Sequence, residues 1–138
     1  MSKPISTNIH IGLKIGGRPK VTKYQTNIVN SIIRILKENI NNKITQEDIS
    51  GMLGYSISYM SKVFKKITGM APIKYLNDMR IDEAKKLIAE DTMSLKDISE
   101  KLGFDTVQYF STQFKKSTNL TPSQYAASVK LTGLLNIF

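Results

Sequence analysis

Apolar residues recur at intervals of three and four along most of residues 26–127, which is the spacing of amphipathic helices. The first such segment, residues 26–40, ends at the Asn41-Asn42 turn. The longest is residues 72–90, where Pro72 suits the first helical position. Its apolar face consists of Tyr75, Leu76, Met79, Ala84, Leu87 and Ile88. The pattern predicts an all-α protein with seven helices.

The segments on either side of residues 72–90 repeat one another. The string Asp-Ile-Ser, followed by Leu-Gly-aromatic, begins at Asp48 and again at Asp97. The offset between the copies is 49 residues up to the glycine and 50 from Tyr59 and Tyr109 onward, so the second copy has one more residue in its turn region. The repeat indicates one helical unit used twice. The helix between the copies is expected to be a spacer of roughly 28 Å, close to the ~34 Å between successive major-groove faces of a duplex.

Each copy has residues that favour two helices joined by a tight turn, the helix-turn-helix plan. Gly54 and Gly103 mark the turns, while Gly69 and Asn119 suit a left-handed helix stop. A short final helix is expected from Pro122 through Ala127. The residues expected to cap the four helix starts are Thr45, Ser56, Ser94 and Asp105.

These patterns divide the chain into five segments. They are a basic N-terminal arm (1–24), a first helix-turn-helix subdomain (25–70), a linker helix (71–91), a second helix-turn-helix subdomain (92–127) and an apolar C-terminal tail (128–138). In the arm, residues 9–15 alternate as a short strand does. Arg18 and Lys20 in its Gly-Gly-Arg-Pro-Lys stretch suit a narrow A·T minor groove, or form a basic linker without a defined contact. We expect residues 9–15 or the tail to pack on the domain.

Composition narrows the class of function. The chain has no cysteine and one histidine, His10, so thiol chemistry, a catalytic triad and a histidine metal cluster are not expected, and no cofactor is implied. A net charge of +9 favours a polyanionic partner. Without a membrane-length apolar run or a signal-peptide pattern, the protein is expected in the cytoplasm and not in a membrane. Neither paired catalytic acids nor a phosphate loop appears, so an enzyme is not expected.

The spaced positions of both copies agree with a known family. They include Tyr75-Leu76, Arg80-Ile81, Ala84, Leu87, Ile98-Ser99, Gly103-Phe104, Tyr109-Phe110-Ser111, Phe114-Lys115-Lys116, Thr121-Pro122 and Tyr125. Over residues 26–127 the chain resembles the DNA-binding region of the AraC/XylS family. The resemblance implies a bacterial transcription regulator, usually an activator, whose two reading helices enter successive major grooves on one face of double-stranded DNA.

Carried over by position, the resemblance implies outward residues on each reading helix. Gln108 suits an adenine edge, Lys62 suits guanine O6 and N7, and Val107 suits a thymine methyl. The expected base-reading residues are Ser58, Ser61, Lys62, Val107, Gln108, Ser111 and Thr112. The expected phosphate-binding residues are Lys65, Lys66, Lys115 and Lys116, with the helix N-termini at Thr45, Ser56, Ser94 and Asp105. Each of these residues also has a simpler interpretation as an ordinary solvated position.

The chain departs from the family at two reading positions. Ser61 and Thr112 stand where relatives often have arginine, so bidentate guanine contacts are few and an A/T-rich site read partly by DNA shape is expected. Arg80 is expected to serve packing, and Tyr59 and Tyr109 to be half-buried.

Several alternatives remain open from the sequence. The chain is either a small stand-alone regulator or the DNA-binding part of a larger protein, and either a monomer or a dimer. RNA polymerase is the expected protein partner. The other function that fits is a protein-interaction module that docks on the polymerase or another regulator without sequence-specific DNA binding.

Overall fold

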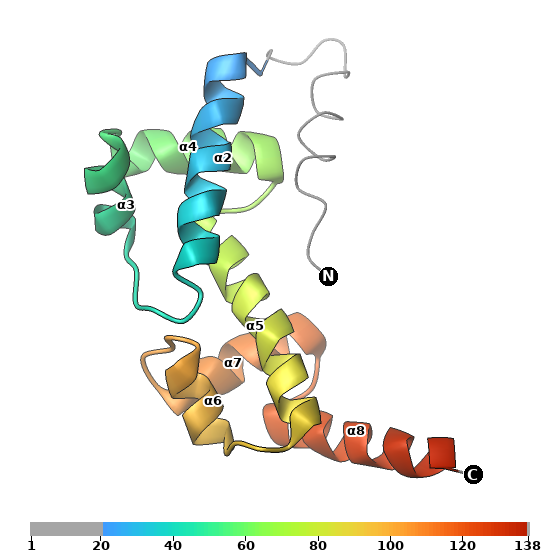
Figure 1. Cartoon of the computed structure of the whole chain (residues 1–138). Coiled ribbons are helices and arrows are strands. Elements are labelled where there is room, and N and C mark those ends of the chain that lie inside the picture. Colours follow the sequence, from blue (N-terminus) through green and yellow to red (C-terminus); the bar gives the residue numbers. More distant parts are fainter. Residues whose placement is uncertain (1–20, 138) are drawn as a thin grey trace. The chain divides into compact units, whose positions relative to one another are not determined.

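A computed structural model of the chain describes residues 21–137 (Figure 1), which form seven α-helices and no strand. The all-α fold expected from the sequence is confirmed. The helices are α2 (Lys23–Glu38), α3 (Gln46–Leu53), α4 (Ile57–Thr68), α5 (Pro72–Glu90), α6 (Leu95–Lys101), α7 (Val107–Thr118) and α8 (Pro122–Ile137). Within residues 21–137, no helix is both long enough and apolar enough to cross a membrane.

The described residues form two compact units. The first contains residues 21–39 and 44–76, and the second contains residues 40–43 and 77–137. Helix α5 contributes its first residues, through Leu76, to the first unit and the remainder to the second. The α2–α3 connection, residues 40–43, belongs to the second unit although the two helices it joins belong to the first.

In the first unit, α2 crosses α4 (Figure 1), and their apolar faces form the core. Phe64 of α4 meets Tyr75 of α5 edge to face, with ring centroids 5.5 Å apart. Burial raises the pKa of Tyr75 to about 12. The buried apolar residues of this unit are Ile28, Val29, Ile32, Ile33, Ile35, Leu36, Ile49, Met60, Val63, Phe64, Tyr75 and Leu76.

In the second unit, the later part of α5 packs with α6, α7 and the start of α8. Aromatic contacts run along α7 and join it to α8: Phe110 meets Phe114 of the same helix with ring centroids 5.8 Å apart, and Phe114 meets Tyr125 of α8 at 5.5 Å. The core residues are Ile81, Ala84, Leu87, Ile88, Ile98, Leu102, Phe104, Phe110 and Phe114. Since α7 supplies Phe110 and Phe114 to this core, its opposite face is left toward solvent.

Arg80 of α5 is buried, with 6% of its surface exposed, and it has a packing role as expected. Its Nε donates to the carbonyl oxygen of Ile40 at 3.1 Å, and its Nη2 donates to that of Asn42 at 2.5 Å. The guanidinium also lies over the Phe104 ring, 5.8 Å from the centroid. Burial lowers the pKa of Arg80. This one side chain therefore holds the α2–α3 connection in the second unit.

The capping residues were correctly predicted at three of the four helix starts. The hydroxyl of Thr45 accepts the Asp48 N–H in a full capping box, and Ser56 and Ser94 accept the N–H groups of Tyr59 and Asp97. The left-handed stops at Gly69 and Asn119 also occur, with φ of 85° and 69°.

The expectation that Asp105 caps α7 is wrong. The N-cap is Thr106, whose Oγ1 accepts the Tyr109 N–H at 2.9 Å. Thr106 lies 50 residues after Ser56, so Asp105 is the extra residue of the second turn. The Asp105 carboxylate instead pairs with Lys43 at 3.2 Å, and both side chains are exposed.

Two helices differ from the sequence prediction in their boundaries. Helix α2 begins at Lys23, because Thr22 and Gln25 form a capping box, and it ends at Glu38 rather than residue 40. Helix α8 does not stop at Ala127 but continues through Ile137.

The residues expected to be an apolar tail are thus helical from Ser128 to Ile137. Its three leucines do not pack on the unit: Leu131, Leu134 and Leu135 are 56–66% exposed. Nearer the start of the segment, Val129 is partly buried and Lys130 pairs with Asp91 at 3.9 Å. The arm, with its predicted strand at residues 9–15 and with Arg18 and Lys20, lies outside the described residues, so its expected packing remains a prediction.

Candidate nucleic-acid interface

Helix α4 presents a polar face opposite its buried one. Met60, Val63 and Phe64 are buried, while Ser58 and Lys62 are exposed. Ser61 is only partly exposed, and its hydroxyl donates to Gln46 Oε1 of α3 at 3.5 Å. Two of the three base-reading residues expected on this helix are therefore open to a ligand, and the third is turned partly toward the neighbouring helix.

Helix α7 presents the equivalent face of the second unit. Gln108 and Thr112 are exposed, and Val107 and Ser111 are partly exposed. Tyr109 is 42% exposed, but its ring contacts Phe104 and its hydroxyl accepts a hydrogen bond from Asn77 Nδ2 at 3.1 Å. The structure thus places all four expected base-reading residues of this helix at its surface and gives Tyr109 the packing role expected for it.

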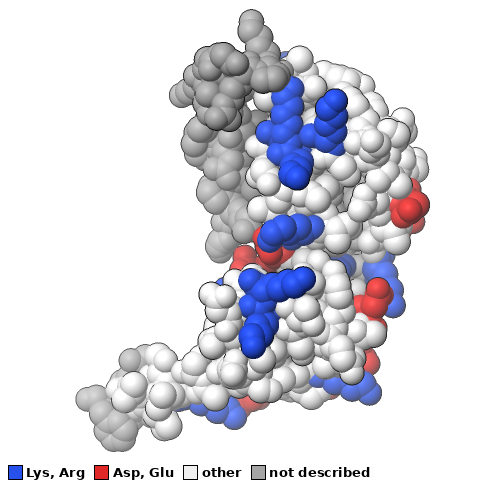
Figure 2. Space-filling model, turned by 180° about the vertical axis from the view of Figure 1, so that it is seen from behind, with Lys and Arg blue, Asp and Glu red and all other residues white. Residues whose placement is uncertain are grey.

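Paired lysines occupy the last turns of both helices. Lys65 and Lys66 lie in the last turn of α4, which ends at Thr68, and Lys115 and Lys116 lie in the last turn of α7, which ends at Thr118. Lysines at a helix C-terminus also stabilise the helix through its dipole, which is a structural reason for their position. Lys66 in addition donates to Gln25 Oε1 at 3.4 Å. Figure 2 shows basic side chains gathered on the surface of each unit, as a polyanion-binding protein requires.

The helix N-termini differ in their suitability for phosphate. Helix α3 has Glu47 and Asp48 in its first turn, and the Thr45 N–H donates to Asp48 Oδ2 at 2.9 Å. Helix α6 has Asp97 in its first turn. These carboxylates repel a phosphate, and at α3 they also occupy an N–H donor. Neither α4 nor α7 has an acid in its first turn, but the exposed Asp105 carboxylate directly precedes the N-cap of α7. The electrostatics therefore favour an anion most clearly at the start of α4.

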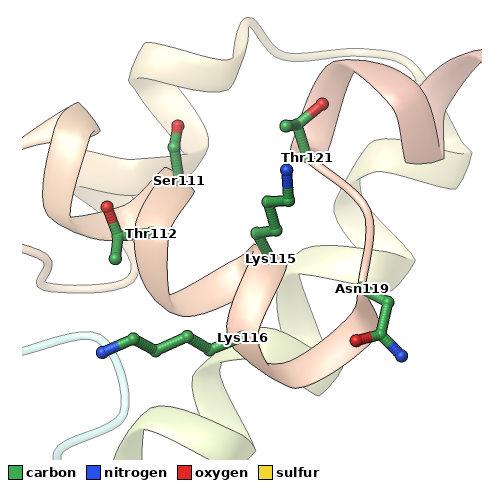
Figure 3. A pocket seen from close by; sticks show the side chains of 6 residues that line it. All are labelled: Ser111, Thr112, Lys115, Lys116, Asn119 and Thr121. Carbon is green, nitrogen blue, oxygen red and sulfur yellow. The ribbon is translucent and has the colours of Figure 1, made fainter.

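A concave surface lies beside the C-terminal half of α7 and encloses a volume of about 530 Å³. It is lined by Ser111, Thr112, Lys115, Lys116, Asn119 and Thr121. Figure 3 shows Lys115 extending from α7 toward Thr121 at the start of α8. The structure thus brings two expected base-reading residues and two expected phosphate-binding lysines together with Asn119 and Thr121, which the sequence analysis did not place in the site.

The first unit has an aromatic cluster that the sequence analysis also missed. Tyr24, at the start of α2, shares a hydroxyl–hydroxyl hydrogen bond with Tyr55 at 2.5 Å, and Tyr55 contacts the ring of Tyr59 with centroids 5.8 Å apart. The hydrogen bond with Tyr55 raises the pKa of Tyr24. No sequence signal joins Tyr24 to Tyr55, because they are 31 residues apart and meet only through the packing of α2 on α4.

No group of three or more His, Cys, Asp or Glu side chains suited to a metal ion occurs within residues 21–137. The polar groups of the two reading faces are hydroxyls, an amide and ammonium groups. These groups form hydrogen bonds to base edges and phosphate oxygens.

Comparison with known proteins gives consistent matches. A family model described as a helix-turn-helix domain matches residues 49–128. The HTH-type transcriptional activator AarP of Providencia stuartii is 33% identical over 84% of this chain and 86% of its own length. Four other curated relatives are longer, and the chain spans 13% to 49% of their length.

Solved structures agree with this result. The C-terminal domain of the two-component response regulator yesN from Fusobacterium nucleatum is 35% identical, with a TM-score of 0.68 over 72% of this chain and 98% of that one. The DNA-binding domain of AdpA, solved in complex with a target DNA, has the same fold at 18% identity, with a TM-score of 0.68 over 76% of this chain and 94% of that one.

Proposed function

Because this chain belongs to the AraC/XylS family of helix-turn-helix regulators, we propose that it binds double-stranded DNA sequence-specifically and activates transcription. Helices α4 and α7 are its two reading helices, and they enter successive major grooves. The observation that carries this proposal is the repetition itself: both copies direct polar and basic residues outward from a helix whose other face is buried.

The chemistry of the exposed residues determines which DNA sequences the two reading helices prefer. Gln108 has an amide that donates to N7-bearing purine edges and accepts from adenine N6, and Lys62 reaches the guanine acceptors O6 and N7. Ser58, Ser111 and Thr112 form single hydrogen bonds with either kind of base. Neither reading face has an arginine among its expected base-reading positions, so the site is A/T-rich and read partly through DNA shape.

The family and the repeat also suggest partners. Since one chain already contains two reading units, a monomer can occupy two half-sites, and dimerisation is not needed for reading. We propose RNA polymerase as the protein partner, because the relative AarP is described as a transcriptional activator. Arg18 and Lys20 of the arm are proposed minor-groove contacts.

Single substitutions test the assignment of the reading helices. Gln108→Ala and Lys62→Ala are each expected to relax base preference at one position, with a cost of about 1–3 kcal/mol for the preferred base. Lys37→Ala is the matched control, because Lys37 is an exposed lysine of α2 in the same unit as Lys62. Base preference is measured by competition among single-base variants of the bound duplex. Unchanged preferences in both reading variants would contradict the assignment, and binding without any preference would favour the protein-interaction module.

A further inference from the structure

The two repeat copies differ at the C-terminal end of their reading helices. When the copies are aligned at the offset of 50 residues, Lys115 and Lys116 correspond to Lys65 and Lys66. Asn119 corresponds to Gly69 of the first copy, and Thr121 corresponds to Ala71. The first copy therefore has no side-chain hydrogen-bonding group at two positions where the second copy has an amide and a hydroxyl. These two positions line the concave surface beside α7 in the second unit.

Each of the polar side chains around this concave surface can donate a hydrogen bond. Two ammonium groups, an amide and three hydroxyls surround it, and none of its six lining residues is acidic. Among the described residues, no ion pair or side-chain hydrogen bond engages Lys115 or Lys116. The Thr121 hydroxyl accepts the Gln124 N–H at 3.1 Å, which leaves its own proton to donate.

We infer that this concave surface of the second unit holds a backbone phosphate of the bound duplex, between Lys115, Asn119 and Thr121. A phosphate oxygen is an acceptor without a proton to donate, so it matches a surface lined by donors. The surface is continuous with the reading face through Ser111 and Thr112, so a backbone group that flanks the bases read by α7 lies within reach. The inference rests on the proposed DNA binding.

The asymmetry has a functional consequence. Phosphate contacts position a reading helix without specifying sequence. The second unit holds its phosphate with the neutral donors of Asn119 and Thr121 as well as with lysines, whereas the first unit has Gly69 and Ala71 at these two positions. The second unit thus has two neutral phosphate-positioning groups, Asn119 and Thr121, that the first unit lacks at this end of its reading helix.

A double-mutant cycle tests whether Lys115 and Asn119 hold the same group. Binding of a duplex selected by the wild-type chain is measured by anisotropy between 50 and 200 mM salt. Lys115→Gln is expected to reduce the salt slope of the binding constant by about 0.9, the value for one phosphate contact. Asn119→Gly introduces the residue of the first copy, suits the φ of 69°, and is expected to weaken binding about 3- to 10-fold.

The effects of these two substitutions are expected to be less than multiplicative in the double variant, because either one alone already loosens the shared phosphate. The matched control is Lys65→Gln combined with Asn119→Gly, where the effects should multiply because the residues belong to different units. Multiplicative effects for Lys115→Gln with Asn119→Gly would overturn the shared site while leaving the proposed function intact. Absence of any duplex binding by the wild-type chain would instead contradict the proposed function itself.

A titration with inorganic phosphate separates backbone from free phosphate. The side-chain amide of Asn119 is followed by NMR in the wild-type chain. A weak shift that disappears when the duplex is added supports the backbone assignment, since both ligands then compete for one place. A saturable shift that persists in the presence of bound duplex would assign the surface to free phosphate and overturn the inference.

Discussion

The turn glycines of the two copies provide a matched pair of substitutions. Gly54 and Gly103 have nearly equal φ values of 78° and 77°. A Cβ at Gly54 would meet nothing within 4 Å, whereas a Cβ at Gly103 would lie 2.8 Å from Arg80 Nη2 and 3.0 Å from the Asn42 carbonyl oxygen. Both alanine substitutions therefore cost the same backbone strain, and only Gly103→Ala also disturbs Arg80.

The free-energy difference between them follows from these contacts. The left-handed conformation costs alanine roughly 1–2 kcal/mol, and the more restricted unfolded chain offsets about 0.4–1 of it. Gly54→Ala is thus expected to cost about 1 kcal/mol. In Gly103→Ala, Arg80 must withdraw from the Asn42 carbonyl, and a hydrogen bond to a charged group is worth about 1.5–3 kcal/mol. The expected total for Gly103→Ala is about 3 kcal/mol.

Hydrogen exchange read by mass spectrometry is the suitable assay, because two units need not unfold together. Gly54→Ala should accelerate exchange in α3 and α4, and Gly103→Ala in α6 and α7. The protection of the slowest amides should fall by a further factor of roughly 30 in Gly103→Ala, the ratio that corresponds to about 2 kcal/mol. Equal losses of protection in the two variants would refute the role assigned to Arg80.

Three further predictions concern stability. The wild type is expected to lose stability at alkaline pH, and Tyr75→Phe is expected not to, because the pKa of Tyr75 is raised from 10.0 to about 12. The protonated phenol therefore stabilises the first unit below pH 10, and this contribution is lost as the pH rises toward 12. Identical alkaline unfolding of the variant and the wild type would contradict the burial effect. In urea unfolding, Thr106→Ala should lower the free energy of unfolding by about 1 kcal/mol because a helix cap is lost. Asp105→Ala should lower it by less than about 0.5 kcal/mol, because only an exposed ion pair is lost. The reverse order would identify Asp105 as the cap. Phe114→Ala should lower the free energy of unfolding by about 3–5 kcal/mol, because Phe114 is in the core. Leu131→Lys should lower it by less than about 0.5 kcal/mol, because Leu131 is 59% exposed. A large thermal destabilisation by Leu131→Lys would mean that this face of α8 is covered.

Sequence periodicity predicted the helices well because they have buried faces and most of them have a side chain that caps the N-terminus. The bounds of α5, Pro72–Glu90, agree with the segment expected from its apolar spacing. The error at Asp105 shows the limit of local rules. Aspartate is as good an N-cap as threonine in general, and only the offset of 50 residues to Ser56 identifies Thr106 as the equivalent position.

Features that depend on packing between distant segments were harder to predict. The packing role of Arg80 was expected, but its partners are carbonyl groups of Ile40 and Asn42, which any sequence provides. The concave surface beside α7 lies where the left-handed stop at Asn119 connects α7 to the start of α8, so its lining comes from two helices and the turn between them. Comparison of the two copies position by position was the available signal for it.

The continuation of α8 past Ala127 has a local explanation. Residues 128–137 contain no proline, so no residue of this segment lacks the N–H that a helical hydrogen bond needs. The apolar residues of this segment suggested a packed tail, yet hydrophobicity alone does not determine whether a partner surface exists.

Selection of bound sequences from a random duplex library, repeated at two salt concentrations, tests the central claim most directly. Two working reading helices predict an enriched bipartite motif, rich in A/T, with its halves about one helical turn apart. The motif should persist at the higher salt concentration, while total binding falls as phosphate contacts weaken. Binding that collapses at higher salt with no enriched sequence at either concentration would contradict sequence-specific recognition by α4 and α7.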